Sequence, residues 1–240
     1  MKKQFGNSNL QVTLIVVILI FSGSLTELSG KEQPTDSKQK SLNILTLGDS
    51  NGALPFGWAN QLKKIRNNDT IFNISVSGNT IGFNNLGRSS LNTLSNIGSY
   101  MNKAYDRLGK IDRIVIMVGT NDCKAVFKDS LSVVPENMRL LISRIRQIAR
   151  THKDKPVIYI VSPPPFGPDE MLEEKYKGGM DRITWLNSQL EIIAGEESVK
   201  FVNSCQILAP VFRHLTTDGV HLNPDGQRMI ALIIQENMKY

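Results

Sequence analysis

The sequence predicts an α/β protein, a three-layer α/β/α sandwich around a five-stranded parallel sheet. Five short runs rich in apolar and β-branched residues recur along the chain, as is typical of strands buried on both faces of a parallel sheet. Longer segments between them carry apolar residues three and four positions apart, the spacing of amphipathic helices. Strands that alternate with helices in this way are joined by right-handed βαβ crossovers.

The expected elements follow one another in a regular order. Strands are predicted at residues 43–47, 71–76, 113–118, 156–161 and 200–202, and helices at residues 58–65, 91–108, 134–151, 180–194 and 224–238. The helix at 134–151 shows the pattern well, because Met138, Leu141 and Ile145 share a face and Pro135 suits a first turn. Sites in such sheets form beyond the carboxyl ends of the strands, so the residues after each strand are the candidates for chemistry.

The N-terminal segment, residues 1–24, is predicted to be a secretory signal peptide. Lys2 and Lys3 give it a positive charge at its start, and residues 12–21 form an apolar run. The small residues 22–24 then suit a signal-peptidase cleavage site after Ser24. The run is shorter than the ~20 residues that span a bilayer, so cleavage and export to the periplasm or the medium are favoured over an uncleaved membrane anchor. After cleavage no stable membrane span is expected. Residues 25–41 are expected to form a polar linker, and residues 42–240 a single folded domain.

Composition excludes several classes of protein. With 18 Gly, 10 Pro and only 2 Cys in 240 residues, the chain is neither collagen-like nor a disulfide scaffold. The net charge of +6 falls to +4 once Lys2 and Lys3 are removed, and the basic residues form no dense cluster, so nucleic acid is not an expected partner. Three scattered His residues and two distant Cys residues lack metal-ligand spacing. No metal site is expected.

The segment Gly48-Asp49-Ser50-Asn51-Gly52 follows the first strand. A serine in a tight turn between strand and helix exposes its hydroxyl beside the backbone amides of the helix start. Gly-Asp-Ser also suits an ordinary helix cap, and Gly-x-Ser-x-Gly is also the nucleophile pattern of the α/β-hydrolase fold. That nucleophile normally follows several earlier strands, whereas Ser50 follows the first, so the second fold is disfavoured.

Further candidates follow the later strands. Gly78, after the second strand, allows close approach of the backbone and offers an unhindered N–H, and Asn121, after the third, offers a side-chain amide. Asp218 and His221 lie three residues apart before the last helix, where the carboxylate can hold Nδ1–H and leave Nε2 free as a base. Each pattern alone is commonly structural, but together with Ser50 they complete a nucleophile, a base and an orienting carboxylate.

In order and spacing these segments resemble the four signature blocks of the SGNH (GDSL) hydrolase superfamily. The blocks are Gly48-Asp49-Ser50, Gly78, Gly119-Thr120-Asn121-Asp122 and Asp218-Gly219-Val220-His221, and the resemblance covers residues 43–239. It implies catalytic Ser50, Asp218 and His221, with an oxyanion hole formed by the Ser50 amide, the Gly78 amide and the Asn121 side chain. It also implies a flavodoxin-like sheet in the order 2-1-3-4-5, and no metal or organic cofactor.

Residues 75–78 and 162–165 further resemble the bacterial exported esterase and lysophospholipase branch of this superfamily. The sequence departs from the family at Asn51, where many members have Leu, and at Asn79, where several have Asp. Both departures leave the catalytic groups in place. The resemblance implies a serine esterase or deacylase for carboxylic esters of carbohydrate or lipid.

Several alternatives stay open at this level. The same three residues would serve an O-acyltransferase, in which an acceptor alcohol outcompetes water, and a non-catalytic carbohydrate-binding descendant would keep the fold alone. His214 is a second candidate base, and Phe166 either lines an acyl pocket or packs in a loop. Export permits a disulfide between Cys123 and Cys205, but a strand separates their positions in the implied sheet order, which leaves that bond undecided.

Overall fold

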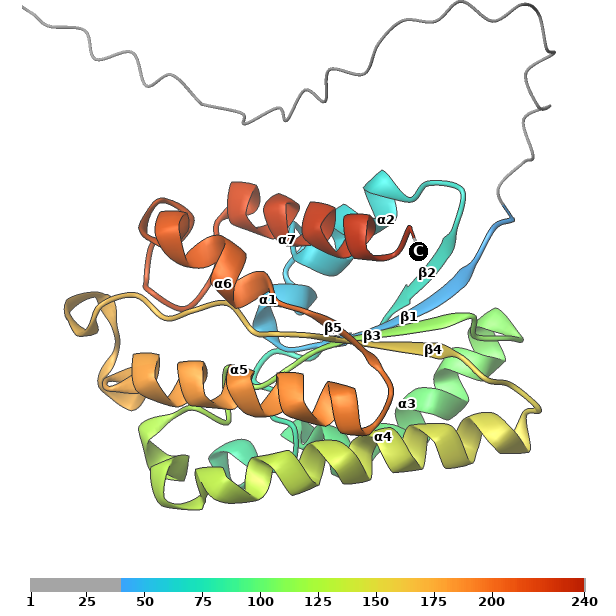
Figure 1. Cartoon of the computed structure of the whole chain (residues 1–240), viewed down its shortest axis with the longest axis horizontal. Coiled ribbons are helices and arrows are strands. Elements are labelled where there is room, and N and C mark those ends of the chain that lie inside the picture. The colour runs from blue at the N-terminus through green and yellow to red at the C-terminus, as the bar shows by residue number, and fades with distance from the viewer. Residues whose placement is uncertain (1–39, 240) are drawn as a thin grey trace, which may run out of the picture. The chain divides into compact units, whose positions relative to one another are not determined.

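A computed structural model describes residues 40–239 (Figure 1). Its centre is a sheet of five parallel strands in the order β2-β1-β3-β4-β5. The strands are β1 (Asn43–Gly48), β2 (Thr70–Asn73), β3 (Arg113–Met117), β4 (Val157–Val161) and β5 (Lys200–Val202). The predicted fold class and strand order are confirmed. The predicted signal peptide and most of the predicted linker lie outside the described residues.

Helices cover both faces of the sheet (Figure 1). One face carries α2 (Trp58–Ile65), α6 (Ser204–Leu208) and α7 (Pro224–Asn237), and the other carries α3 (Thr93–Leu108), α4 (Val134–Thr151) and α5 (Gly179–Glu196). Helices α2 and α4 have the bounds that their periodicity predicts. The sequence analysis missed α6, because five residues are too few to show a helical period. Within residues 40–239 no helix is long and apolar enough to cross a bilayer.

Strand β3 shows why the chain forms this sheet. Ile114 and Ile116 pack into the core beneath α3, α4 and α5, whereas Val115 and Met117 pack into the core beneath α2 and α7. All four side chains are buried. Because successive side chains point to opposite faces and both faces are covered, the strand is apolar at every buried position.

Among the boundaries that differ from the predicted ones, the end of β2 and the start of α3 involve polar side chains. Strand β2 ends at Asn73 rather than at residue 76, although Ile74 N and Val76 N still donate to Thr46 O and Gly48 O. The Asn73 side chain accepts hydrogen bonds from Thr46 Oγ1 at 3.0 Å and from Ser75 N at 3.0 Å. Helix α3 begins at Thr93 rather than at residue 91, because Asn92 caps it by accepting from Ser95 N. At the start of α3 the Asn92 side chain takes over a hydrogen bond that a longer helix would make within its backbone.

Candidate active site

Ser50 begins α1 (Ser50–Ala53), a single helical turn directly after β1. Asp49 caps this turn, since its Oδ1 accepts from Asn51 N at 2.9 Å. The turn lies so close to the loop after β2 that a Cβ atom on Gly52 would collide with Ser75 Oγ. The Ser50 hydroxyl is therefore presented at the carboxyl edge of the sheet, partly accessible to solvent.

Ser50, His221 and Asp218 form a continuous chain of hydrogen bonds. Ser50 Oγ lies 2.9 Å from His221 Nε2, and His221 Nδ1 lies 2.6 Å from Asp218 Oδ2. The backbone amides of Val220 and His221 donate to Asp218 Oδ1 at 2.9 and 2.7 Å. Burial acts to raise the pKa of Asp218, but the hydrogen bonds from His221 and Val220 outweigh it and leave that pKa below its ordinary value. An ionised Asp218 is suited to hold the Nδ1–H tautomer of His221.

Asn51 fixes the loop of His221 to the turn of Ser50. Its buried Oδ1 accepts from Leu222 N at 3.0 Å and from Gln227 Nε2 at 2.8 Å, and its Nδ2 donates to Val220 O at 3.4 Å. Val220 and Leu222 flank His221, so this amide helps to hold the loop that carries the imidazole, together with the bonds of Asp218 to His221 N and Nδ1. A leucine could make none of these bonds. The departure at Asn51 therefore has a structural role next to Ser50, the candidate nucleophile.

Sequence analysis missed Gln227, which lies fully buried in α7. Besides its bond to Asn51, its Oε1 accepts from Trp58 N at 2.9 Å, at the first residue of α2. Gln227 thus connects α2, α7 and the Ser50 turn. A glutamine in the first turn of an amphipathic helix looks solvent-facing in sequence, and only its partners reveal the connection.

Gly78 and Asn121 lie beyond β2 and β3 at the same edge. Gly78 has φ +89°, a backbone conformation that favours glycine. Its N–H, like that of Ser50, donates to no acceptor among residues 40–239. Asn121 Nδ2 donates one hydrogen to Asn79 O at 3.0 Å, and Tyr176 Oη donates to Asn121 Oδ1 at 3.4 Å. The second Asn121 N–H and the two backbone N–H groups are thus donors suited to an oxyanion.

Asp122 anchors the loop that follows β2, a role that sequence analysis did not assign. Both of its carboxylate oxygens accept from Ile81 N, at 3.0 and 2.9 Å. The side chain is fully buried, and burial raises the pKa of Asp122 to about 7 in spite of these backbone hydrogen bonds. The loops of Gly78 and Asn121 are therefore joined through a carboxyl group.

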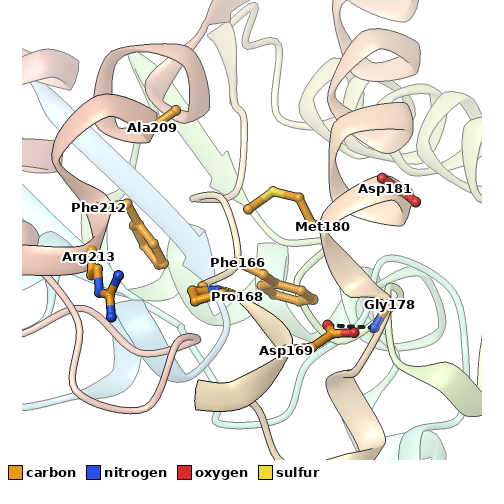
Figure 2. Close-up of a pocket in the computed structure, with 10 residues that line it drawn as sticks. Phe166, Pro168, Asp169, Gly178, Met180, Asp181, Ala209, Phe212 and Arg213 are labelled. Atoms are coloured by element: carbon orange, nitrogen blue, oxygen red, sulfur yellow. Dashed lines mark hydrogen bonds between the residues drawn. The ribbon is translucent and has the colours of Figure 1, made fainter.

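A cavity of about 450 Å³ lies between residues 166–169, the start of α5 and residues 209–213 (Figure 2), and none of Ser50, Asp218 and His221 lines it. Its walls combine apolar and charged side chains: Phe166, Met180, Phe212, Asp169, Asp181 and Arg213. Gly167 N in this wall donates to Gly219 O at 2.8 Å, two residues before His221. Asp169 Oδ1 accepts from Gly178 N at 2.9 Å, the dashed line in Figure 2. Phe166, whose role the sequence left open, both packs in the core and lines this cavity.

The remaining candidates lie elsewhere or are unpaired. His214 is exposed, and its carbonyl accepts from Asn223 Nδ2, whereas the imidazole in contact with Ser50 is that of His221.

Cys123 and Cys205 are free thiols, so the structure contains no bond between them. Burial raises the pKa of both thiols. In the part of the chain that the structure describes, no group of three or more His, Cys, Asp or Glu side chains could hold a metal ion.

Comparison with known proteins identifies the class, an esterase-type hydrolase that acts on carboxylic esters. The model of the GDSL-like lipase/acylhydrolase family matches residues 24–229, and the chain belongs to this family. The resemblance to SGNH (GDSL) hydrolases is thereby confirmed. No curated protein matches the sequence.

Solved structures share the fold at low sequence identity. Est24, a carbohydrate acetylesterase from Sinorhizobium meliloti, superposes with a TM-score of 0.65 at 21% identity, over 80% of this chain and 98% of that chain. The aryl esterase of M. smegmatis gives a TM-score of 0.64 at 22% identity, over 80% of this chain and 97% of that chain. Both structures support the α/β/α sandwich described above.

Proposed function

We propose that the chain hydrolyses carboxylic esters through an acyl-enzyme formed on Ser50. The observation that carries this proposal is the 2.9 Å contact between Ser50 Oγ and His221 Nε2, with Asp218 on the other ring nitrogen. A serine hydroxyl is a weak nucleophile unless a base removes its proton. His221 accepts that proton as Oγ attacks the ester carbonyl carbon, and ionised Asp218 stabilises the imidazolium that results.

The tetrahedral intermediate places a negative charge on the former carbonyl oxygen. In the proposed mechanism this oxyanion accepts hydrogen bonds from Ser50 N, Gly78 N and Asn121 Nδ2. The C–O bond to the leaving group then breaks, His221 gives its proton to the departing alcohol, and the acyl group stays on Ser50 Oγ. Water, deprotonated by His221, attacks this acyl ester and releases the carboxylic acid. The serine hydroxyl is restored for the next cycle.

We propose an O-acetylated carbohydrate as the natural substrate. The cavity in Figure 2 supports this choice, because Asp169, Asp181 and Arg213 at its walls are side chains that hydrogen-bond hydroxyl groups. Similarity to a carbohydrate acetylesterase points in the same direction. A lipid ester, the second substrate class implied by the sequence, would need space for a long acyl chain and would show itself as a preference for long-chain esters.

The test uses purified wild-type protein and Ser50→Ala. Wild type should hydrolyse para-nitrophenyl acetate faster than the octanoate, and acetylated xylan or a similar acetylated sugar should release acetate. Ser50→Ala should lose this activity and keep the unfolding temperature, because among residues 40–239 the hydroxyl makes a single side-chain hydrogen bond, to His221 Nε2. A fluorophosphonate should label Ser50, as located by mass spectrometry of the peptides. Wild-type turnover by Ser50→Ala would refute the mechanism.

Two further outcomes would change the assignment. An acyltransferase would transfer the acetyl group to an added acceptor sugar and form acetylated sugar at the expense of free acetate. A non-catalytic carbohydrate-binding protein would bind the sugar and show no turnover in the wild type. Both outcomes are read from the same reactions by separating acetate, acetylated acceptor and unreacted ester.

We also propose that the protein is exported, with residues 1–24 removed and residues 25–41 acting as a linker. The support is the charge, apolar run and small residues of the N-terminal sequence. N-terminal sequencing of the protein recovered outside the cytoplasm of an expressing bacterium should begin at Leu25. Recovery of the chain only inside the cell, beginning at Met1, would contradict export.

A further inference from the structure

Lys124 is a buried lysine behind the donors of the proposed oxyanion hole. It follows the Asn121 turn directly and is 7% exposed. None of the ion pairs among residues 40–239 includes it. Burial and the nearby Lys175 lower the pKa of Lys124, while Asp49, Glu173 and Asp122 act in the opposite direction. Burying a cation without an ion-pair partner costs free energy. The burial of Lys124 therefore needs a compensating role among the neighbouring groups that it contacts.

Asn85 connects Lys124 to Gly78. Lys124 Nζ donates to Asn85 Oδ1 at 3.1 Å, and Asn85 Nδ2 donates to Gly78 O at 2.7 Å. An ammonium group has only donors, so it fixes which end of the Asn85 amide faces it and turns the NH₂ group toward Gly78. Asn85 is 1% exposed. The carbonyl of Gly78, whose N–H is a proposed oxyanion donor, is therefore held by two consecutive buried hydrogen bonds.

Lys124 also contacts the side chain that supports Asn121. Its Nζ lies 5.6 Å from the centre of the Tyr176 ring, and Tyr176 Oη donates to Asn121 Oδ1 at 3.4 Å. This hydrogen bond fixes the orientation of the Asn121 amide, because a hydroxyl that donates must face the amide oxygen Oδ1. The Nδ2 group then points away from Tyr176. One lysine thus lies against the supports of two of the three proposed donors.

We propose that Lys124 is a positioning residue that holds the oxyanion hole in its productive geometry, acting mainly through Asn85 on Gly78. The inference rests on the proposed function and adds a residue to the same site. Oxyanion donors stabilise the transition state only when they are oriented before the charge develops. A loss of this orientation lowers kcat and leaves substrate binding nearly unchanged.

The structure offers a matched control for Lys124. Lys175 Nζ lies 5.3 Å from the centre of the same Tyr176 ring but pairs with Glu173 at the surface. Lys124→Met keeps the aliphatic stem and removes the donor, and we expect it to lower kcat about 10- to 100-fold with KM within about twofold. Lys175→Met should keep wild-type kcat, because it has no contact with Asn85.

A double-mutant cycle tests the route through Asn85. Asn85→Ala should lower kcat about as much as Lys124→Met, and the double variant should resemble Asn85→Ala alone, because both act on the same contact. If the two losses in kcat multiply in the double variant, the route through Asn85 is wrong. If Lys124→Met fails to fold, Asn85→Ala decides instead, since it leaves Lys124 in place; a wild-type kcat in that variant overturns the proposal.

A second measurement separates positioning from stability. A fluorophosphonate places its phosphoryl oxygen where the oxyanion forms, so its inactivation rate should fall in Lys124→Met together with kcat. A lysine that only stabilised the fold would lower the unfolding temperature and leave both rates unchanged, which would overturn the proposal. Ser50→Ala is run beside these variants: if Ser50→Ala is inactive, a null result at Lys124 refutes only the positioning role, whereas an active Ser50→Ala refutes the proposed function itself.

Discussion

The side-chain oxygen of Asn51 accepts a hydrogen bond from the backbone N–H of Leu222 at 3.0 Å. Asn51 follows Ser50, the candidate nucleophile, and Leu222 follows His221, the candidate base. This hydrogen bond therefore connects the chain beside the nucleophile to the chain beside the base. Ser50 and His221 are 171 positions apart in the chain, and the bonds of Asn51 to Val220 and Leu222 are among the contacts that hold their two loops together.

Replacing Asn51 by leucine, the residue common in the family, should damage this site. Asn51→Leu leaves the Leu222 N–H and the Gln227 amide buried without their acceptor, and each such group costs roughly 1–3 kcal/mol. We expect a lower free energy of unfolding in urea and a lower kcat, because the His221 loop is released. Adding Gln227→Leu to Asn51→Leu should not recover the stability, because the buried Trp58 N–H then also loses its acceptor, Gln227 Oε1. Wild-type kcat in Asn51→Leu would show that the loop is held by other contacts.

Asn121→Ala tests the side-chain donor of the oxyanion hole. The substitution removes one proposed donor, and a loss of this kind lowers kcat on the order of 100- to 1000-fold. KM should change little, because the bond forms mainly in the transition state. Steady-state kinetics with para-nitrophenyl acetate separate the two constants. An effect on KM alone would assign Asn121 to substrate binding instead.

Asp122 should make the protein less stable as the pH rises. Its pKa is about 7 when folded and 3.8 in its ordinary state, so between these values the folded chain holds a proton that the unfolded chain has lost. The free energy of unfolding then falls with pH over this range. Asp122→Asn cannot ionise and should not show the fall, which amounts to about 2 kcal/mol between pH 5 and pH 7.

The measurement for Asp122 is urea unfolding of both proteins at pH 5, 6 and 7. Asp112→Asn is the control, because the backbone hydrogen bond from Asn43 and the charge of Lys110 outweigh burial and lower the pKa of Asp112. The contribution of ionised Asp112 to the free energy of unfolding is present at neutral pH and is lost only on acidification. Equal pH slopes for wild type and Asp122→Asn would show that Asp122 is already ionised in the folded protein.

The two cysteines should titrate as free thiols. In unreduced, denatured protein a thiol reagent should find two reactive groups, since neither cysteine is bonded in the structure. In the native protein Cys123 should react far more slowly than in the denatured chain, because it is fully buried and its thiol pKa is raised by burial. Detection of no thiol after denaturation would mean that a disulfide forms in the exported protein.

Much of the site could be predicted because its residues follow strands. The apolar runs ending near Gly48 and Met117 mark strand ends, and in a parallel sheet all carboxyl ends meet at one edge. Ser50, Gly78 and Asn121 could thus be assigned to that edge from the order of elements, whereas the 218–221 segment, which precedes the last helix, could be assigned to the site only by its pattern and by the family resemblance. The helices at 58–65 and 134–151 were predictable because their periodicity depends only on neighbouring residues.

The α/β class, the helices with a clear period and most residues at the sheet edge can therefore be predicted from local sequence patterns. Asn51, Gln227, Asn85 and Lys124 form hydrogen bonds that become visible only in the folded chain. Each is a polar residue whose hydrogen-bond partner lies elsewhere in the chain, such as the 176 positions between Asn51 and Gln227. Periodicity records which face of an element is buried, but a buried hydrogen bond depends on the distance and direction between two particular atoms, and those exist only once the elements have packed.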